Sequence, residues 1–89
     1  MWYVYILKLK NGDLYKGMTR DLRRRLDEHS RGLVQSTKPY RPTVLVGYEA
    51  YQCESDAIRR EQFLKTTEGR RLLNQQYRDT IAHGNRTEK

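Results

Sequence analysis

Four side chains in the first third of the sequence are of types that can handle protons and phosphate. Tyr5 and Tyr15 stand ten residues apart, Arg25 follows ten residues after Tyr15, and His29 follows four residues after that. Tyrosine and histidine can exchange protons, and the planar arginine fork matches phosphate oxygens. Each residue alone is more often structural, as a core tyrosine or as part of a solvated helix face. Together they form a candidate catalytic site if the fold brings them to one surface.

The tyrosines fall in two segments that predict a β-hairpin. Residues 2–7 and 14–18 are strand-like, and the turn dipeptide Asn11-Gly12 lies between them. The first segment is rich in aromatic and β-branched side chains and is apolar on both faces. We therefore expect it to be a buried strand.

The length of the turn decides whether the two tyrosine rings share a face. A two-residue loop would place Tyr5 and Tyr15 on opposite faces of the strand pair. A three-residue loop over residues 10–12, with Gly12 in the left-handed region, places Tyr5 opposite Gly17 and both rings on one face. Gly17 then leaves room beside Tyr5. We predict this bulged register.

Arg25 and His29 fall in a segment that predicts a helix over residues 20–31. Thr19 is a suitable N-cap, and Gly32 is a suitable C-terminal stop. Because Arg25 and His29 are four residues apart, they project from the same face of this helix. The helix can therefore present both side chains to one surface.

The remaining sequence predicts a third strand, two further helices and a tail. The strand spans residues 43–51, and the helices span residues 55–65 and 68–78. We assign residues 1–78 to one domain. Residues 79–89 offer little apolar surface to bury, so we expect them to be a flexible C-terminal tail.

Glu61 interrupts the apolar stripe of the second predicted helix. The stripe contains Ala57, Ile58 and Leu64, and spacings of three and four residues place Glu61 among them. A buried carboxylate without a partner costs several kcal/mol, so a cationic partner is expected if the stripe is right. An arginine ion pair, simple exposure at the edge of the stripe and a divalent metal at the edge of a cleft all stay open.

The composition favours a nucleic-acid partner. The 89 residues include 18 Lys and Arg against 11 Asp and Glu, with a formal net charge of +7 and a pI near 9.8. Such a basic, arginine-rich domain suits phosphate backbones, although the same charge would also keep a small protein in solution. The single cysteine, Cys53, excludes a disulfide within one chain, and the first apolar run is too short for a membrane span. We expect a monomeric, cytoplasmic protein that binds DNA, with RNA left open.

Five basic residues are candidate nucleic-acid contacts: Lys16, Arg20, Arg24, Lys38 and Arg41. They lie on the second strand, around the first helix and in the loop that follows it, where they can grip phosphates. The sequence has no evident base-reading element, such as a helix with outward-facing Asn or Gln. We expect salt-sensitive binding dominated by the backbone, with a preference for nicked, branched or single-stranded substrates.

The order and spacing of these motifs resemble the GIY-YIG nuclease superfamily, most closely its small single-domain members. The resemblance covers about residues 2–75. It rests on Tyr3-Val4-Tyr5, on Tyr15-Lys16-Gly17 followed by Thr19-Arg20-Asp21-Leu22-Arg23-Arg24-Arg25, on His29 and on Glu61. Tyr3 stands where the family motif has Gly, and Lys16 stands where it has Ile. Neither departure removes a group that the expected chemistry needs.

The resemblance implies an α+β fold, with a three-stranded antiparallel β-sheet flanked by helices in the order β-β-α-β-α-α. It also implies an endonuclease that hydrolyses phosphodiester bonds in DNA with one divalent metal, Mg²⁺ or Mn²⁺. A single carboxylate leaves such a hard cation open to waters and phosphate oxygens. The alternatives are a non-catalytic nucleic-acid-binding module with the same fold and a nuclease that acts only with a partner.

The resemblance also implies a role for each candidate residue. Tyr5 would be the general base, Tyr15 its hydrogen-bonding companion and Glu61 the only protein ligand of the metal. Arg25 would hold the scissile phosphate, and His29 would orient or shuttle a proton; Gly17 and Asn74 are weaker candidates. Because the ordinary pKa of tyrosine is about 10, a cation would have to lower the pKa of Tyr5. The metal, Arg25 and Lys16 are the candidates for this effect.

Overall fold

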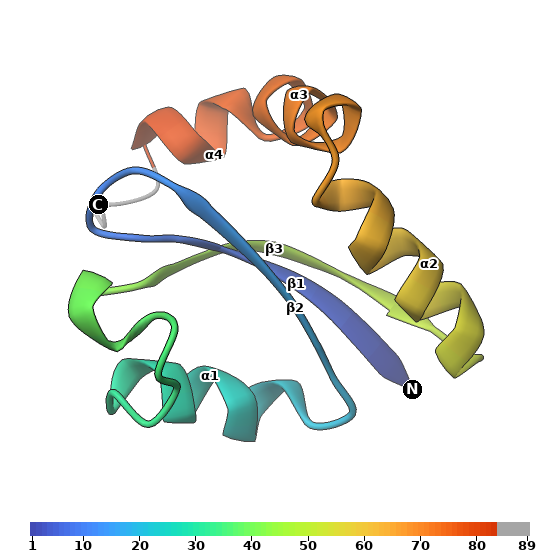
Figure 1. The fold of residues 1–89 in the computed structure, drawn as a ribbon, viewed down its shortest axis with the longest axis horizontal. Helices are drawn as coiled ribbons and strands as arrows, with labels where there is room; N and C mark the ends of the chain where they lie inside the picture. Colours follow the sequence, from blue (N-terminus) through green and yellow to red (C-terminus); the bar gives the residue numbers. More distant parts are fainter. Residues whose placement is uncertain (84–89) are drawn as a thin grey trace.

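A computed structural model describes residues 1–83 and has a three-stranded antiparallel sheet between two layers of helices (Figure 1). The strands are β1 (Trp2–Lys8), β2 (Leu14–Thr19) and β3 (Val44–Tyr51), in the order β2-β1-β3. The central strand is therefore β1, and its residues 4–7 are at most 1% exposed. Burial on both faces explains why this segment is apolar throughout. The expected α+β fold is confirmed.

The hairpin between β1 and β2 has the predicted bulged register. Tyr5 lies opposite Gly17, and Tyr15 is on the same face. Gly12 has a φ of +92°, and its N–H donates to the Leu9 carbonyl at 2.9 Å. A Cβ atom on residue 17 would lie 2.4 Å from the Tyr5 hydroxyl oxygen. Only glycine therefore fits beside this ring.

Helix α1 (Leu22–Ser30) begins two residues later than predicted, because Asp21 rather than Thr19 is its N-cap. The Asp21 carboxylate accepts a hydrogen bond from the Arg24 N–H at 3.0 Å. The Thr19 hydroxyl instead accepts from the Asp21 N–H at 3.1 Å and shapes the preceding turn. At the other end the prediction is confirmed: Gly32 has a φ of +76° and turns the chain out of the helix.

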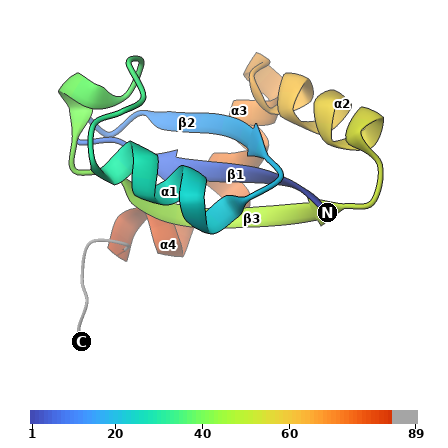
Figure 2. The same cartoon turned by 90° about the horizontal axis from the view of Figure 1, so that it is seen from below.

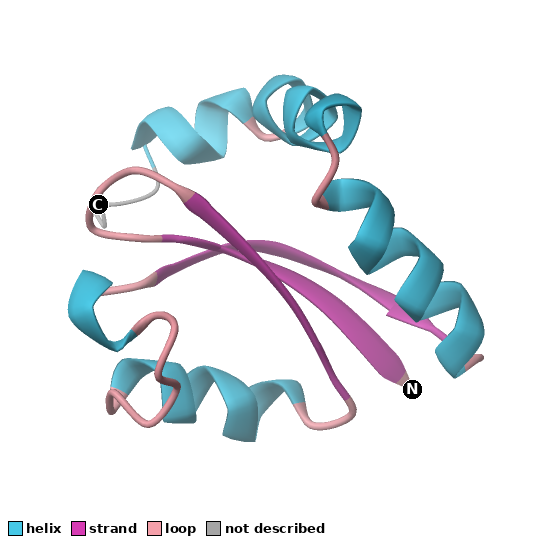
Figure 3. Ribbon diagram, in the orientation of Figure 1, coloured by secondary structure: helices cyan, strands magenta, loops and turns pink. Residues whose placement is uncertain are grey.

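Helices cover both faces of the sheet. On one face lie α1 and the segment after it, which includes the short 3₁₀ helix η1 (Lys38–Tyr40). On the other face lie α2 (Glu54–Leu64), α3 (Thr67–Gln76) and α4 (Arg78–His83) (Figure 3). Figure 2 shows α1 in front of the sheet and the other three helices behind it. Two cores result, and β1 contributes to both of them.

The two cores differ in character. The core beneath α2 and α3 is aliphatic and contains Val4, Ile6, Ala57, Leu64 and Leu73. The core beneath α1 contains Tyr5, Leu7 and Leu9, with Tyr15, Leu22 and Leu26 packed against them. The α1 face is therefore the one on which polar aromatic groups are buried.

A β-bulge lies in the pairing of β1 with β3. The register shifts by one residue between Ile6 and Leu7, which leaves Val46 as the extra residue. Val46 packs against the core beneath α2 and α3. Tyr48, which pairs with Tyr5, lies on the α1 face of the sheet.

The C-terminal part of the described chain differs from the expected tail. Residues 79–83 belong to α4, and the Lys8 ammonium donates to the Ile81 carbonyl at 2.8 Å. For residues 84–89 the expectation falls outside the described part of the chain. Within residues 1–83, every helix is too short or too polar to cross a membrane.

Candidate active site

A buried chain of hydrogen bonds links the sheet to α1 and to the loop after it. The Tyr5 hydroxyl oxygen lies 2.8 Å from His29 Nε2, and His29 Nδ1 lies 2.8 Å from Thr37 Oγ1. The Thr37 hydroxyl donates to the Val34 carbonyl at 3.4 Å. Tyr5, His29 and Thr37 are at most 1% exposed. A side chain from each of three segments is therefore fixed in the protein interior.

The hydrogen bonds of this chain favour one neutral tautomer of His29. Because Thr37 donates to a carbonyl, its oxygen is free to accept from the Nδ1–H of His29. The other nitrogen, Nε2, is then bare and accepts from the Tyr5 O–H. Burial, and then the positive charge of Arg25, lower the pKa of His29. The imidazole is therefore neutral near pH 7 and can take up a proton at Nε2.

Tyr15 completes an aromatic cluster around this chain. Its ring centroid lies 5.1 Å from that of His29 and 6.3 Å from that of Tyr5. The His29 ring is edge-on to both tyrosine rings. The contact of Tyr15 with Tyr5 is ring packing, whereas the resemblance had implied a hydrogen bond.

Arg25 lies beside the Tyr5 hydroxyl and is also paired with Glu28. Its Nη1 donates to Glu28 Oε1 at 2.8 Å, on the same helix. Burial raises the pKa of Tyr5 to about 12, while Arg25 acts in the opposite direction as a hydrogen-bond partner and as a charge. Arg25 thus lowers the pKa of Tyr5, as expected, but the rise caused by burial is larger. With its pKa raised to about 12, Tyr5 is a neutral phenol near pH 7.

Lys16 lies on the other side of β2 and does not act on Tyr5 in this way. Its ammonium donates to the Leu14 carbonyl at 3.0 Å. Burial, followed by the charges of Arg70 and Lys65, lowers the pKa of Lys16. Three cations therefore gather beside the hairpin, on the α2 and α3 side of the edge strand.

Glu61 lies at the edge of the apolar stripe of α2. Ala57 and Leu64 of the predicted stripe are fully buried, but Ile58 is 37% exposed, so its assignment to the stripe is wrong. The Glu61 side chain is 20% exposed and lies 3.3 Å from the Lys65 ammonium. Its cationic partner is therefore a lysine one turn further along the same helix. The charge of Glu61 also reaches Tyr5, where it adds to the rise in pKa caused by burial.

Glu61 offers one carboxylate that could hold a metal ion. Within residues 1–83, no three His, Cys, Asp or Glu side chains gather closely enough to hold an ion by themselves. One hard oxygen ligand suits Mg²⁺, which keeps several waters and takes further oxygens from phosphate groups. Lys65 would have to release Glu61 when the metal binds.

The other predicted residues are distributed over several surfaces. Asn74 lies above the hairpin turn, in a pocket that Lys16 and Arg70 also line, and it donates to the Arg70 carbonyl at 2.9 Å. It is thus placed with the basic residues and not with the aromatic cluster. The remaining basic candidates are exposed around α1 and the loop after it: Arg20, Arg24, Lys38 and Arg41.

Thr37 is the residue of this site that the sequence analysis missed. It lies in the loop between α1 and β3, seven residues beyond the end of the helix that carries His29. The positive φ of Gly32 returns the chain towards the helix, and the Thr37 N–H donates to the Val34 carbonyl at 3.1 Å. A lone threonine in a loop carries no sequence signal for this role.

Comparison with known proteins agrees with the fold and with the arrangement of the motifs. The family model for the GIY-YIG catalytic domain matches residues 1–77. The chain therefore belongs to the GIY-YIG family, and the resemblance drawn from the sequence is confirmed.

Within this family the chain is similar to UPF0213 proteins. UPF0213 proteins from several strains of Staphylococcus aureus are 42% identical to it over 65 residues, which is 72% of this chain and 79% of theirs. The solution NMR structure of the UPF0213 protein BH0048 from Bacillus halodurans matches with a TM-score of 0.54 and 34% identity. The match covers 82% of each chain.

We expect Thr37→Val to destabilise the protein by about 1–3 kcal/mol, because it leaves the buried Nδ1–H of His29 without an acceptor. Urea unfolding curves measure the loss. Thr37→Ser keeps the hydroxyl and should recover most of the stability, while Thr67→Val, at an exposed position, serves as the control. Equal stability of the Thr37→Val and Thr37→Ser variants would contradict this assignment.

Proposed function

We propose that this protein is a metal-dependent endonuclease that hydrolyses phosphodiester bonds in DNA, with a preference for substrate structure over sequence. The match to a GIY-YIG catalytic domain supports a nuclease. The observation that carries the proposal is the buried contact between the Tyr5 hydroxyl and His29 Nε2 at 2.8 Å. A buried tyrosine hydroxyl needs a hydrogen-bond partner, and here the partner is a group that can also take up its proton.

In this proposal Tyr5 takes a proton from the attacking water while passing its own proton to His29. The transfer needs no free phenolate, which matters because burial raises the pKa of Tyr5 to about 12. As the water oxygen bonds to phosphorus, the bond from phosphorus to the leaving sugar oxygen breaks, and that oxygen takes a proton from solvent. His29 returns to its resting state by passing the extra proton back through the Tyr5 hydroxyl to solvent. Thr37 keeps the imidazole in the orientation that this transfer requires.

Arg25 and a metal bound to Glu61 would offset the negative charge of the phosphate. Arg25 is partly exposed, and a phosphate could compete with Glu28 for its guanidinium. Since Arg25 lies near Tyr5, its fork would be beside the water that Tyr5 activates. When bound to Glu61, Mg²⁺ or Mn²⁺ would add positive charge next to the phosphoryl oxygens.

The surface charge supports binding through the phosphate backbone. One group of cations lies around α1 and the loop after it: Arg20, Arg24, Lys38 and Arg41. A second group lies beside the hairpin: Lys16, Lys65 and Arg70. The cations beside the hairpin lie close enough to lower the pKa of Lys16, so an anion between them would be favoured. Because β2 is an edge strand, a phosphate backbone lying across it would meet both groups of cations.

One observation favours a second candidate, a nucleic-acid-binding module or a nuclease that acts only with a partner. The charged groups of the candidate site are already paired within the chain, Arg25 with Glu28 and Glu61 with Lys65. A site in this state must exchange both pairs before it can act. A substrate, or a partner protein, would have to drive that exchange.

Cleavage assays with the full chain test the proposal. Labelled single-stranded, duplex and branched DNA, and RNA of matched sequence, are incubated with Mg²⁺, with Mn²⁺ and with chelator. We expect cleavage that depends on the metal and falls at least about 100-fold in Tyr5→Phe and in Glu61→Ala. Tyr40→Phe and Glu68→Ala, which change an exposed tyrosine and an acidic residue on another helix, should retain activity.

Two results would contradict the nuclease proposal. Cleavage that persists in chelator, or in both site variants, would assign the activity to a contaminant or to other residues. Tight binding of every substrate without cleavage under either metal would support the binding-module alternative instead.

Salt dependence tests the proposed backbone contacts separately. We expect the affinity for duplex DNA to fall steeply with salt, and the slope of log K against log salt to shrink by about one unit in Arg24→Ala. Arg59→Ala, which removes an exposed arginine paired with Asp56 on α2, is the matched control. An unchanged slope in Arg24→Ala would remove this arginine from the interface.

A further inference from the structure

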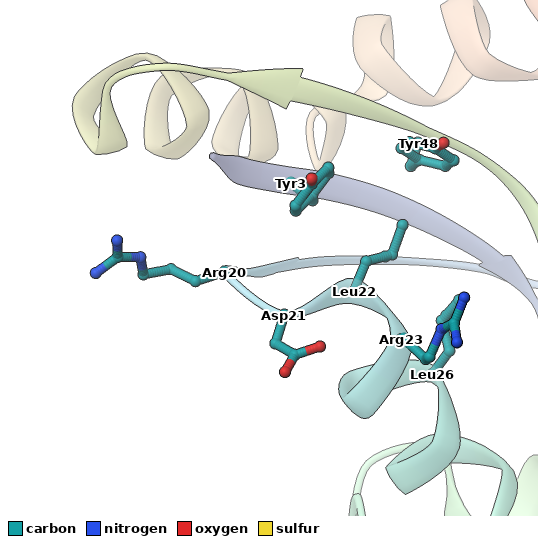
Figure 4. A pocket seen from close by; sticks show the side chains of 7 residues that line it. All are labelled: Tyr3, Arg20, Asp21, Leu22, Arg23, Leu26 and Tyr48. Atoms are coloured by element: carbon teal, nitrogen blue, oxygen red, sulfur yellow. The ribbon is translucent and has the colours of Figure 1, made fainter.

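A second cavity lies on the same face of the sheet, between β3 and the beginning of α1 (Figure 4). It has a volume of about 570 Å³, and its walls include Tyr3, Tyr48, Leu22 and Leu26. Ligand sites that hold a drug-sized molecule are usually of about 300–1,000 Å³, so a nucleoside fits in size. None of the residues with a proposed catalytic role lines this cavity.

Two tyrosines form its aromatic wall. The rings of Tyr3 and Tyr48 meet edge to face, with centroids 5.9 Å apart. Tyr48 is 52% exposed although it stands in the middle of a strand. Its side chain projects from the α1 face of the edge strand β3, where α1 leaves it open. It therefore offers an open aromatic surface to solvent.

Arginines supply the charge around this aromatic wall. Arg20 stands where the cavity meets the beginning of α1, and its side chain extends outward, with its guanidinium 5.2 Å from the centre of the Trp2 ring. Arg23 stands beside Leu26 (Figure 4). The acidic residue in the wall, Asp21, is engaged as the N-cap of α1. The cavity thus combines aromatic and aliphatic walls with a positive rim.

We propose that this cavity binds unpaired bases of a single-stranded nucleic acid, which stack on Tyr48 while Arg20 and Arg23 contact the adjacent phosphates. Stacking suits any base, because every base has a π-face, and arginines at the rim match the backbone. A base inside a duplex is already stacked on both sides and cannot enter. The positive rim, on a chain of net charge +7, disfavours a second copy as the occupant.

This inference rests on the proposed function and narrows its substrate. Arg23 and Arg25 are two residues apart, so they project from opposite flanks of α1. The stacking cavity and the Tyr5 hydroxyl therefore lie on the two sides of one helix. A strand that reaches both must pass around the beginning of α1, near Arg20. Such a path requires a flexible single-stranded segment, as at a flap or a branch.

Binding in the presence of chelator tests the inference without cleavage. The full chain is titrated into fluorescein-labelled oligo(dT), into an oligomer of the same length with abasic sites, and into a duplex. We expect Tyr48→Ala to weaken oligo(dT) binding by about 5- to 150-fold, which is the range for loss of a base–aromatic stack. Tyr48→Phe keeps the ring and should bind as the wild type does.

The controls separate stacking from loss of structure. The wild type should bind the abasic oligomer as weakly as Tyr48→Ala binds oligo(dT). This comparison tests stacking without any change to the protein. Phe63→Ala removes a similarly exposed ring that stands under Arg60 on α2, and it should leave oligo(dT) affinity unchanged. Circular dichroism checks the fold of each variant.

Two outcomes would overturn the inference. The first is equal affinity of wild type and Tyr48→Ala for oligo(dT), with no effect of abasic sites. The second is a wild-type dimer in light scattering that Tyr48→Ala converts to a monomer, which would assign the cavity to a second copy. Because the assay contains no metal, either result leaves the nuclease proposal standing, and absence of cleavage would leave the stacking site standing.

Discussion

The hydrogen bond between Tyr5 on the central strand and His29 on α1 is the constraint on which the other features of the site depend. It can form only if the Tyr5 ring lies across the neighbouring strand, and Gly17 is the residue that permits this close approach. The bulged turn at Gly12 sets the register that brings Gly17 opposite Tyr5. Beyond the helix, Gly32 lets the chain return so that Thr37 supports the far side of the imidazole.

Burial gives this pair its chemical character. It raises the pKa of Tyr5 and lowers the pKa of His29, so each group is neutral at rest and the proton between them stays on Tyr5. The charged residues around the pair are balanced by neighbours on their own helices. The charges of the resting site are therefore neutralised by partners within the protein, and a phosphate would have to displace Glu28 from Arg25. In the proposed nuclease, this exchange would link substrate binding to activation.

The sequence predicted the parts of the structure that depend on local sterics and on periodicity. The hairpin register followed from the turn residues, and the shared face of the α1 residues followed from their spacing. The start of α1 was misplaced because Thr19 and Asp21 are both good caps and only the geometry decides between them. Contacts between distant segments carry no such local signal. Only the structure reveals three such features: Thr37 beneath His29, Lys65 beside Glu61 and the exposed ring of Tyr48.

The pH dependence of single-turnover DNA cleavage tests the proton transfer from Tyr5 to His29 most directly. If neutral His29 must accept the proton, the rate is constant near pH 7 and falls as the pH drops through the pKa of His29. Because burial lowers that pKa, the fall should occur below the ordinary histidine value of about 6.5. The rate should not require the pH to approach the pKa of Tyr5, which is about 12. A rate that rises tenfold per pH unit from pH 7 to pH 10 would show that a free phenolate is needed and would contradict the account.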